Sequence, residues 1–494
     1  MSKLRSNMIY QAIYHVLAVC IPLVTSPYLS RVLKAEGLGI YSYNYSIVSY
    51  FILFALLGVS TYGMRAISQS KDKQEASRNF FGIYAFQLIS SLVSLLAYVI
   101  FVIVFVKDDV ARIVSWVQIL YILGEVFNIN WFFFGLEKYR SIVLRNIVIK
   151  LLTFISIFVF VKDEGDVVVY VLILALAHAL SNIVIWINVR GNIVWTRIGW
   201  SDVAKHIKPN IVLFIPALAA SVYHIMDKTM LGLLSDDTNS GYYYNADKLL
   251  NIPLTLVAGC SSVFMTRTCT LVKDNDTEGI RKTQNESIYF GMCAISAIAF
   301  GVCAVAGEFV PWYFGKEFEP CITLVKYFAV IVIMKTISTH TRSVFLIPES
   351  NDKSYAKAIV CGALINLVAN FVLMYCFGLG ALGATIGTLI AEVVVVIMQI
   401  LFMKNASSMK ACVKGILFSS IYLVLGALML LVVEIIPINI QSLTVTLMLK
   451  ILIGASVYMA ECIVLWLIRP SLMPDMVKET VLQVFGKIKR IIKR

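Results

Sequence analysis

Long runs of apolar residues constrain this chain more than any other feature of its sequence. Of its 494 residues, 59% are hydrophobic and 14% are charged, whereas a soluble domain carries about 25% charged residues. Many of the runs are long enough to cross a bilayer as a helix, which takes about 20 residues. A soluble core could not hold them all, because such cores stop growing at about 250–300 residues. The sequence therefore predicts an all-α, polytopic membrane protein.

The apolar runs predict about 14 membrane-spanning helices joined by short loops. They are expected at residues 8–33, 40–64, 80–106, 112–135, 142–161, 167–189, 208–234, 242–266, 286–306, 321–347, 356–377, 380–403, 411–434 and 444–468. The first run is longer than the apolar core of a signal peptide and contains two prolines, so we expect it to be retained as a span. None of the loops is long enough to form a domain.

The positions of Lys and Arg predict that both ends of the chain lie in the cytoplasm. If the N-terminus is inside, the loops on the opposite side hold few basic residues, namely Arg31, Lys34, Lys107, Arg112, Lys162 and Lys316. Most of the other basic residues then fall on the inner side, as is usual for cytoplasmic loops. This bias accounts for the net charge of +13 without a nucleic-acid partner.

A weak internal repeat predicts two similar halves. The segment GLGIYSYNYSI at 37–47 follows the first span, and NSGYYYNADKLL at 239–250 follows the seventh, which makes Gly39 and Gly241 equivalent. Spans 1–6 and 7–12 would then form two six-helix lobes in the same orientation, related by an axis along the membrane normal. The predicted division is an N-lobe at 1–200, a C-lobe at 201–405, two extra spans at 406–469 and a tail at 470–494. Basic and apolar residues of the tail predict an amphipathic helix on the inner leaflet.

Sequence signatures of enzymes and of metal sites are absent. There is no P-loop and no HExxH sequence, and there is no GxSxG sequence. None of the 10 cysteines belongs to a CxxC pair, and no two of the five histidines have the spacing of metal ligands. We therefore expect no catalytic residue, no metal and no cofactor.

Ionisable residues inside the apolar runs are the candidate functional residues. A charge at the centre of a membrane helix costs about 2.5–3.5 kcal/mol, so most of them should face a wet interior or one another. The cations are Arg31, Lys228, Lys248, Lys335 and Arg342, and the carboxylates are Glu125, Asp227 and Glu392. Structural ion pairs are the alternative to a substrate pathway. For Glu392 both readings stay open: a lone carboxylate that takes up an ion, or a pair with Lys335 or Arg342.

Several segments are similar to the polysaccharide transporter family, whose superfamily also includes multidrug antiporters and lipid II flippases. They are PLVTSPYLSRVLKAEGLGIYSYNYS, NWFFFGLEKYRS, YHIMDKTMLG followed by GYYYNADKLL, and INLVANFVLMYCFGLGALGATIGTLIAEVV. The resemblance implies a non-enzymatic flippase in the bacterial cytoplasmic membrane, with two lobes around a central cavity. It also implies the substrate, a polyprenyl-diphosphate-linked oligosaccharide repeat unit used for O-antigen, capsule or exopolysaccharide. Arg31, Asp227, Lys228 and Lys248 lie in the matching segments.

The resemblance and the charges together give the candidate residues their expected roles. A diphosphate is anionic, so the five cations are candidates for binding substrate, and the three carboxylates are candidates for coupling to H⁺ or Na⁺. Expected partners are membrane lipids, the lipid-linked oligosaccharide, and polysaccharide polymerase and assembly proteins. Three alternatives are a multidrug antiporter, which would need a more acidic cavity, a membrane polymerase or ligase, which would need a larger outer loop than 307–320, and a scaffold protein.

Overall fold

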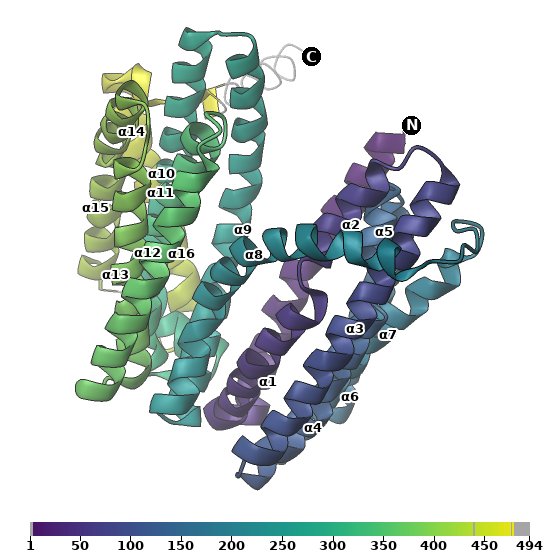
Figure 1. The fold of residues 1–494 in the computed structure, drawn as a ribbon. Helices are drawn as coiled ribbons and strands as arrows, with labels where there is room; N and C mark the ends of the chain where they lie inside the picture. Colours follow the sequence, from purple (N-terminus) through teal and green to yellow (C-terminus); the bar gives the residue numbers. More distant parts are fainter. Residues whose placement is uncertain (1–2, 438–439, 476, 479–494) are drawn as a thin grey trace, which may run out of the picture. The chain divides into compact units, whose positions relative to one another are not determined.

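The computed structural model describes residues 3–437, 440–475 and 477–478, and these are almost entirely helical (Figure 1). The first nine α-helices are α1 Lys3–Leu56, α2 Val59–Ser68, α3 Lys73–Phe105, α4 Asp109–Val126, α5 Asn130–Gly135, α6 Tyr139–Phe160, α7 Val167–Val184, α8 Trp200–Leu234 and α9 Asp237–Lys273. They are followed by α10 Thr277–Tyr313, α11 Cys321–Thr341, α12 Asp352–Phe371, α13 Gly380–Leu401, α14 Ala406–Ser419, α15 Ile421–Ile435 and α16 Leu443–Ile468. No strand occurs among the described residues, so the predicted all-α class is confirmed.

The helices expose apolar side chains and bury polar ones, as the helices of membrane proteins do. On α3, the apolar side chains of Leu96, Ile103 and Phe105 are exposed, whereas the polar side chains of Gln87 and Ser91 are fully buried. In water such exposure would be unfavourable, because apolar surface is stabilised by its removal from water. Lipid tails are as apolar as these side chains, so the pattern fits helices that meet lipid on the outside and one another on the inside.

Within the described part of the chain, twelve helical stretches are long and apolar enough to cross a membrane. The first of them, Val19–Ser68, takes in the first predicted span from residue 19 onward, the loop expected at 34–39 and the whole second span. Lys34, the first residue of that loop, leaves the helical conformation with φ 59° and ψ −177°, and α1 consists of two helices that meet at this kink. The break therefore falls where it was expected, but it takes a single residue. The helix α8 covers the predicted seventh span. The full number of about 14 spans stays a prediction.

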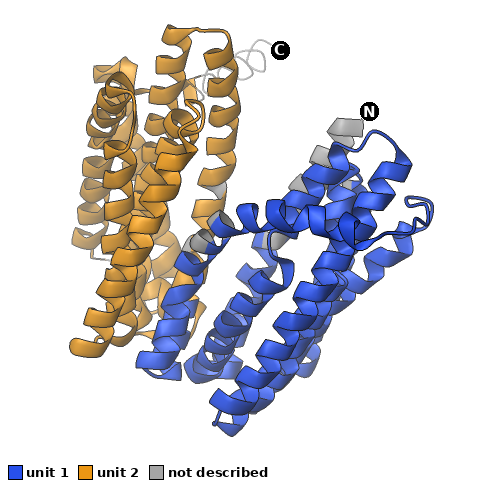
Figure 2. Cartoon of the chain, viewed as in Figure 1, with its two compact units in different colours: residues 1–244 blue, residues 245–494 orange. Residues whose placement is uncertain are grey.

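The chain divides into two compact units, residues 1–244 and 245–494 (Figure 2). We call them unit 1 and unit 2. The helix α8 belongs to unit 1 because it packs against α1, α2 and α3. The predicted lobes instead meet at residue 200, and the four-part division of the chain stays a prediction. Residues 479–494, which make up most of the predicted amphipathic tail, lie outside the described residues.

Helix α10 is the central element of unit 2. It packs against α11 on one side and against α14, α15 and α16, the helices of the predicted extra spans, on the other. An ion pair between Glu308 of α10 and Lys450 of α16 joins these two helices. Both side chains are about four-fifths buried, and pairing offsets part of the cost of placing their charges inside the protein.

Candidate functional site

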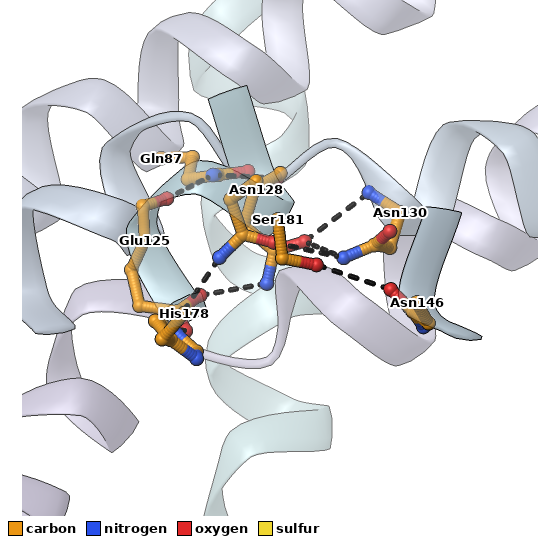
Figure 3. A network of polar contacts seen from close by, with 8 residues as sticks. Gln87, Glu125, Asn128, Asn130, Asn146, His178 and Ser181 are labelled. Atoms are coloured by element: carbon orange, nitrogen blue, oxygen red, sulfur yellow. Dashed lines mark hydrogen bonds and ion pairs between the residues drawn. The ribbon is translucent and has the colours of Figure 1, made fainter. Parts of the chain in front are cut away.

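A network of buried polar side chains in unit 1 is built around Glu125, one of the predicted coupling residues (Figure 3). Glu125 lies in the last turn of α4 and is only 3% exposed. Its Oε1 atom is 2.7 Å from Nε2 of His178 on α7. Its Oε2 atom accepts a hydrogen bond of 2.7 Å from Nδ2 of Asn128. Both carboxylate oxygens are therefore hydrogen-bonded, as a buried carboxylate requires.

Two amide side chains connect Glu125 to a buried cation, Arg145. The Nη2 atom of Arg145 donates to Oδ1 of Asn130 at 3.0 Å. Asn130 donates in turn to Oδ1 of Asn128 at 2.8 Å, and Asn128 donates to Glu125. All three bonds point from the cation toward the carboxylate, so each polarises the next. An unbroken series of hydrogen bonds therefore joins the guanidinium group of Arg145 to the carboxylate of Glu125.

Gln87 of α3 holds the backbone where α4 ends and α5 begins. Its Nε2 atom donates to the backbone carbonyls of Glu125 at 2.7 Å and of Asn128 at 2.8 Å. Its Oε1 atom accepts from Nε1 of Trp131 at 2.9 Å. The last carbonyls of a helix have no partner within that helix, and Gln87 supplies one. The position of the Glu125 side chain is thus fixed from three helices.

His178 connects this network to a row of tyrosines. Its side chain is 34% exposed, and its ring centre is 5.2 Å from that of Tyr121. Further ring contacts of 5.3–5.8 Å run from Tyr121 to Tyr45, from Tyr45 to Tyr41 and from Tyr41 to Tyr244. The tyrosine row therefore reaches from the α4–α7 network to the start of α9, all within unit 1.

The predicted pair Asp227 and Lys228 lies at the other end of the tyrosine row. Asp227 of α8 is buried and accepts a hydrogen bond of 2.6 Å from the hydroxyl of Tyr243. The Nζ atom of the half-buried Lys228 is 5.7 Å from the ring centre of Tyr244, within the range of a cation–π contact. The structure thus brings three predicted residues, Glu125, Asp227 and Lys228, into one connected polar and aromatic region.

Arg31, the fourth predicted residue of unit 1, is exposed on α1, three residues before the break at Lys34. Beside it, Nζ of Lys34 is 3.6 Å from Oε1 of Glu164, which follows α6. The break in α1 therefore lies beside two cations, and Lys34 is paired with a carboxylate that follows α6.

Two of the four predicted residues of unit 2 lie together. Lys335 of α11 and Glu392 of α13 form a pair, with Nζ 3.9 Å from Oε1 and side chains 20% and 5% exposed. Of the two readings for Glu392, the geometry matches the pair with Lys335. Arg342, at the end of α11, is exposed and lies 4.8 Å from the ring centre of Tyr355. Lys248 is half-buried on α9.

Sequence reasoning selected Glu125 but missed the side chains that surround it, above all His178 and Gln87. The available signal was a set of polar side chains within or beside apolar runs, namely Gln87, Asn128, Asn130, Asn146, His178, Ser181 and Asn182. Each is costly in a lipid-facing position, so together they predict a shared buried site. Their pairing still depended on which helices are neighbours.

A helical protein with many spans and buried charges within them defines the class of a membrane transporter. The chain belongs to the polysaccharide biosynthesis protein family, whose profile matches residues 4–265, and this confirms the predicted relationship. It is 24% identical over 405 residues to a putative O-antigen transporter of Shigella dysenteriae, which covers 80% of this chain and 99% of that protein.

Two solved structures share the fold. The lipid II flippase MurJ aligns over 94% of this chain and 99% of its own, with a TM-score of 0.72 and 14% identity. A multidrug resistance transporter of the MATE family aligns over 85% of this chain and 95% of its own, with a TM-score of 0.60 and 12% identity. The fold is therefore shared by flippases and drug transporters and does not separate them.

Proposed function

We propose that this chain is a flippase that moves polyprenyl-diphosphate-linked oligosaccharide repeat units from the inner to the outer leaflet of the bacterial cytoplasmic membrane. It would act by alternating access, without catalysing a reaction, and would supply its product to polysaccharide polymerase and assembly proteins. The observation that carries the proposal is the similarity to an O-antigen transporter, which extends over 99% of that protein's length.

The charges within the described spans support an anionic substrate rather than a cationic drug. Lys228 on α8 and Lys248 on α9 are both half-buried, and Lys228 lies against an aromatic ring. A cation held in a partly dehydrated site attracts a diphosphate more strongly than it would in water. A polymerase or ligase is less well supported, because the connection between α10 and α11, Phe314–Pro320, is short.

Removing the candidate substrate-binding cations should slow translocation. We expect Lys228→Ala, Lys248→Ala and Arg342→Ala each to lower the initial flipping rate by about tenfold, because a hydrogen bond to a charged group contributes about 1.5–3 kcal/mol. The measurement is flipping of a fluorescent polyprenyl-diphosphate-linked sugar in proteoliposomes. Lys353→Ala is the control, since Lys353 is an exposed cation at the start of α12. Unchanged rates in all three variants would contradict the electrostatic part of the proposal.

We place coupling to a proton gradient at the contact between Glu125 and His178. A proton shared across their 2.7 Å contact would change the charge at one end of the chain of amides that leads to Arg145. The other ionisable groups facing the contact are Tyr121, against the His178 ring, and Tyr45, which interacts electrostatically with Glu125. The partial exposure of the His178 side chain supports access for a proton to this contact.

The Glu125→Gln variant should fold and flip substrate without responding to an imposed pH gradient. Gln keeps an oxygen for the Asn128 amide but cannot lose a proton, so the charge at this position becomes fixed. Initial flipping rates in proteoliposomes with and without the gradient measure the effect, and Glu434→Gln, an exposed carboxylate of α15, is the control. A full response of Glu125→Gln to the gradient would remove this residue from the coupling mechanism.

A further inference from the structure

Unit 2 contains a cationic pocket whose lining includes none of the candidate residues for substrate binding or coupling. It has a volume of about 480 Å³ and is formed by α10, by α14 and by the end of α16 with the short turn after it. Its polar lining includes Arg281, Lys410, Lys414, Arg469, Asn285 and Tyr289. At Gly415 the two helices approach closely, because a Cβ atom there would lie 2.9 Å from Cδ1 of Ile288 on α10.

The charge of this pocket has one sign. Among the described residues that line it, four are cations and none is acidic. Arg281 also borders a second pocket, whose lining includes the carboxylates of Glu278 and Glu349. The neighbouring Lys282 pairs with Asp475 at 2.8 Å and is not part of the lining. Four cations around one pocket repel one another, and binding an anion would relieve this repulsion.

The pocket lies where three candidate spans begin or end, which is where lipid headgroups are expected. Arg281 is near the start of the candidate span Thr277–Tyr313, Lys410 and Lys414 are near the start of Ala406–Ile435, and Arg469 directly follows Leu443–Ile468. Three spans therefore begin or end at it, on the side predicted to be cytoplasmic. Basic pockets between transmembrane helices on that side of a membrane bind anionic lipid headgroups.

Exposed apolar side chains continue from the pocket toward the bilayer core. Leu417 and Phe418 of α14 lie three and four residues after Lys414, and Leu467 and Ile468 of α16 directly precede Arg469. All four are exposed, Leu467 by 77% and Leu417 by 67%. An anion free in the cytoplasm would gain nothing from them, whereas the acyl chains of a lipid would cover them.

We propose that this pocket binds the phosphate headgroup of an anionic glycerophospholipid from the surrounding leaflet. The cations contact the phosphate, and the acyl chains lie along the exposed apolar residues of α14 and α16. Because the lining comes from α10, α14 and α16 together, a bound lipid stabilises the packing of these helices against one another. The site is separate from the flippase residues, so it stands or falls independently of the proposed transport activity.

The test is a binding titration of the purified full-length chain with short-chain lipids, followed by native mass spectrometry and by thermal unfolding. Dioctanoyl phosphatidylglycerol should bind and raise the unfolding temperature, whereas dioctanoyl phosphatidylcholine should do so at least about tenfold more weakly. In Lys410→Gln/Lys414→Gln, the affinity for phosphatidylglycerol should fall by about tenfold or more, since each cation near an anionic lipid surface contributes about 1 kcal/mol.

The control is Lys353→Gln/Lys357→Gln, which removes two exposed cations with the same spacing from the start of another helix, α12. Its affinity should change by less than about threefold. Equal losses in both double variants, or none in either, would overturn the site. Inorganic phosphate or pyrophosphate that binds with the same dependence on Lys410 and Lys414, but without the need for acyl chains, would overturn the lipid assignment. If the α14 variant does not fold, Arg469→Gln tests the same pocket from the end of α16.

Discussion

The Gly241→Ala variant is expected to lose most of its transport activity, and Gly39→Ala should behave in the same way. The first turns of α9 and the part of α1 after its break touch through their backbones. A Cβ atom on Gly241 would lie 1.8 Å from the carbonyl oxygen of Ala35, and one on Gly39 would lie 1.7 Å from that of Asp237. No real side chain tolerates such distances, so either substitution must force the two helices apart.

The expected loss follows from the place of this contact in the chain. The contact lies near the turn between α8 and α9, on the side that is predicted to face outside. If access alternates, α1 and α9 must separate and rejoin there. Inserting a methyl group into a closely packed contact costs about 1–3 kcal/mol, which is enough to shift a conformational equilibrium by about tenfold or more. The variants should therefore fold but populate the state in which α1 and α9 are apart.

The measurements are the flipping rate in proteoliposomes and the reaction of a cysteine introduced at the contact with a membrane-impermeant thiol reagent. Transport should fall and labelling should rise in both glycine variants. Gly259→Ala is the control, because Gly259 lies on the same helix, α9, and no atom lies within 4 Å of a Cβ built on it. Normal transport by Gly241→Ala would mean that the contact between α1 and α9 does not open during the cycle.

This contact also shows how far the sequence alone could lead. The repeat made Gly39 and Gly241 equivalent, and in the structure each approaches a residue near the other. A reciprocal contact of this kind is what a twofold axis between equivalent helices produces. The repeat did not show that the two positions lie close together. Equivalent positions in a repeat share an orientation, but the distance between them is not fixed by the repeat.

The helical class and the candidate charges were predictable for a different reason. An apolar run is a property of one segment alone and shows that this segment can cross the bilayer, so the helices could be located one at a time. Contacts between side chains depend instead on which helices are neighbours. Glu125 and His178 are 53 positions apart in the chain, and no local pattern joins them. The break in α1 lies within the loop expected at 34–39, but the sequence did not show that a single residue, Lys34, carries it.

The Glu392→Gln variant is expected to lower the free energy of unfolding by about 1–3 kcal/mol, because it leaves the ammonium group of Lys335 without its carboxylate inside the protein. The pair joins α11 to α13 across 3.9 Å, with side chains that are 20% and 5% exposed. Lys335→Met should cost at least as much, since the remaining carboxylate of Glu392 is the more deeply buried of the two. Denaturant unfolding in mixed micelles measures both effects.

The double variant Lys335→Met/Glu392→Gln separates a structural pair from a coupling site. If the two residues mainly satisfy each other, removing both leaves no uncompensated charge, and the double variant should recover most of the stability that either single variant loses. A coupling carboxylate predicts the opposite pattern. Glu392→Gln would then keep its stability and lose its response to an ion gradient, and Lys335→Met would restore nothing. Because the two patterns differ in stability and in transport, one set of variants decides whether this buried charge holds unit 2 together or drives the cycle.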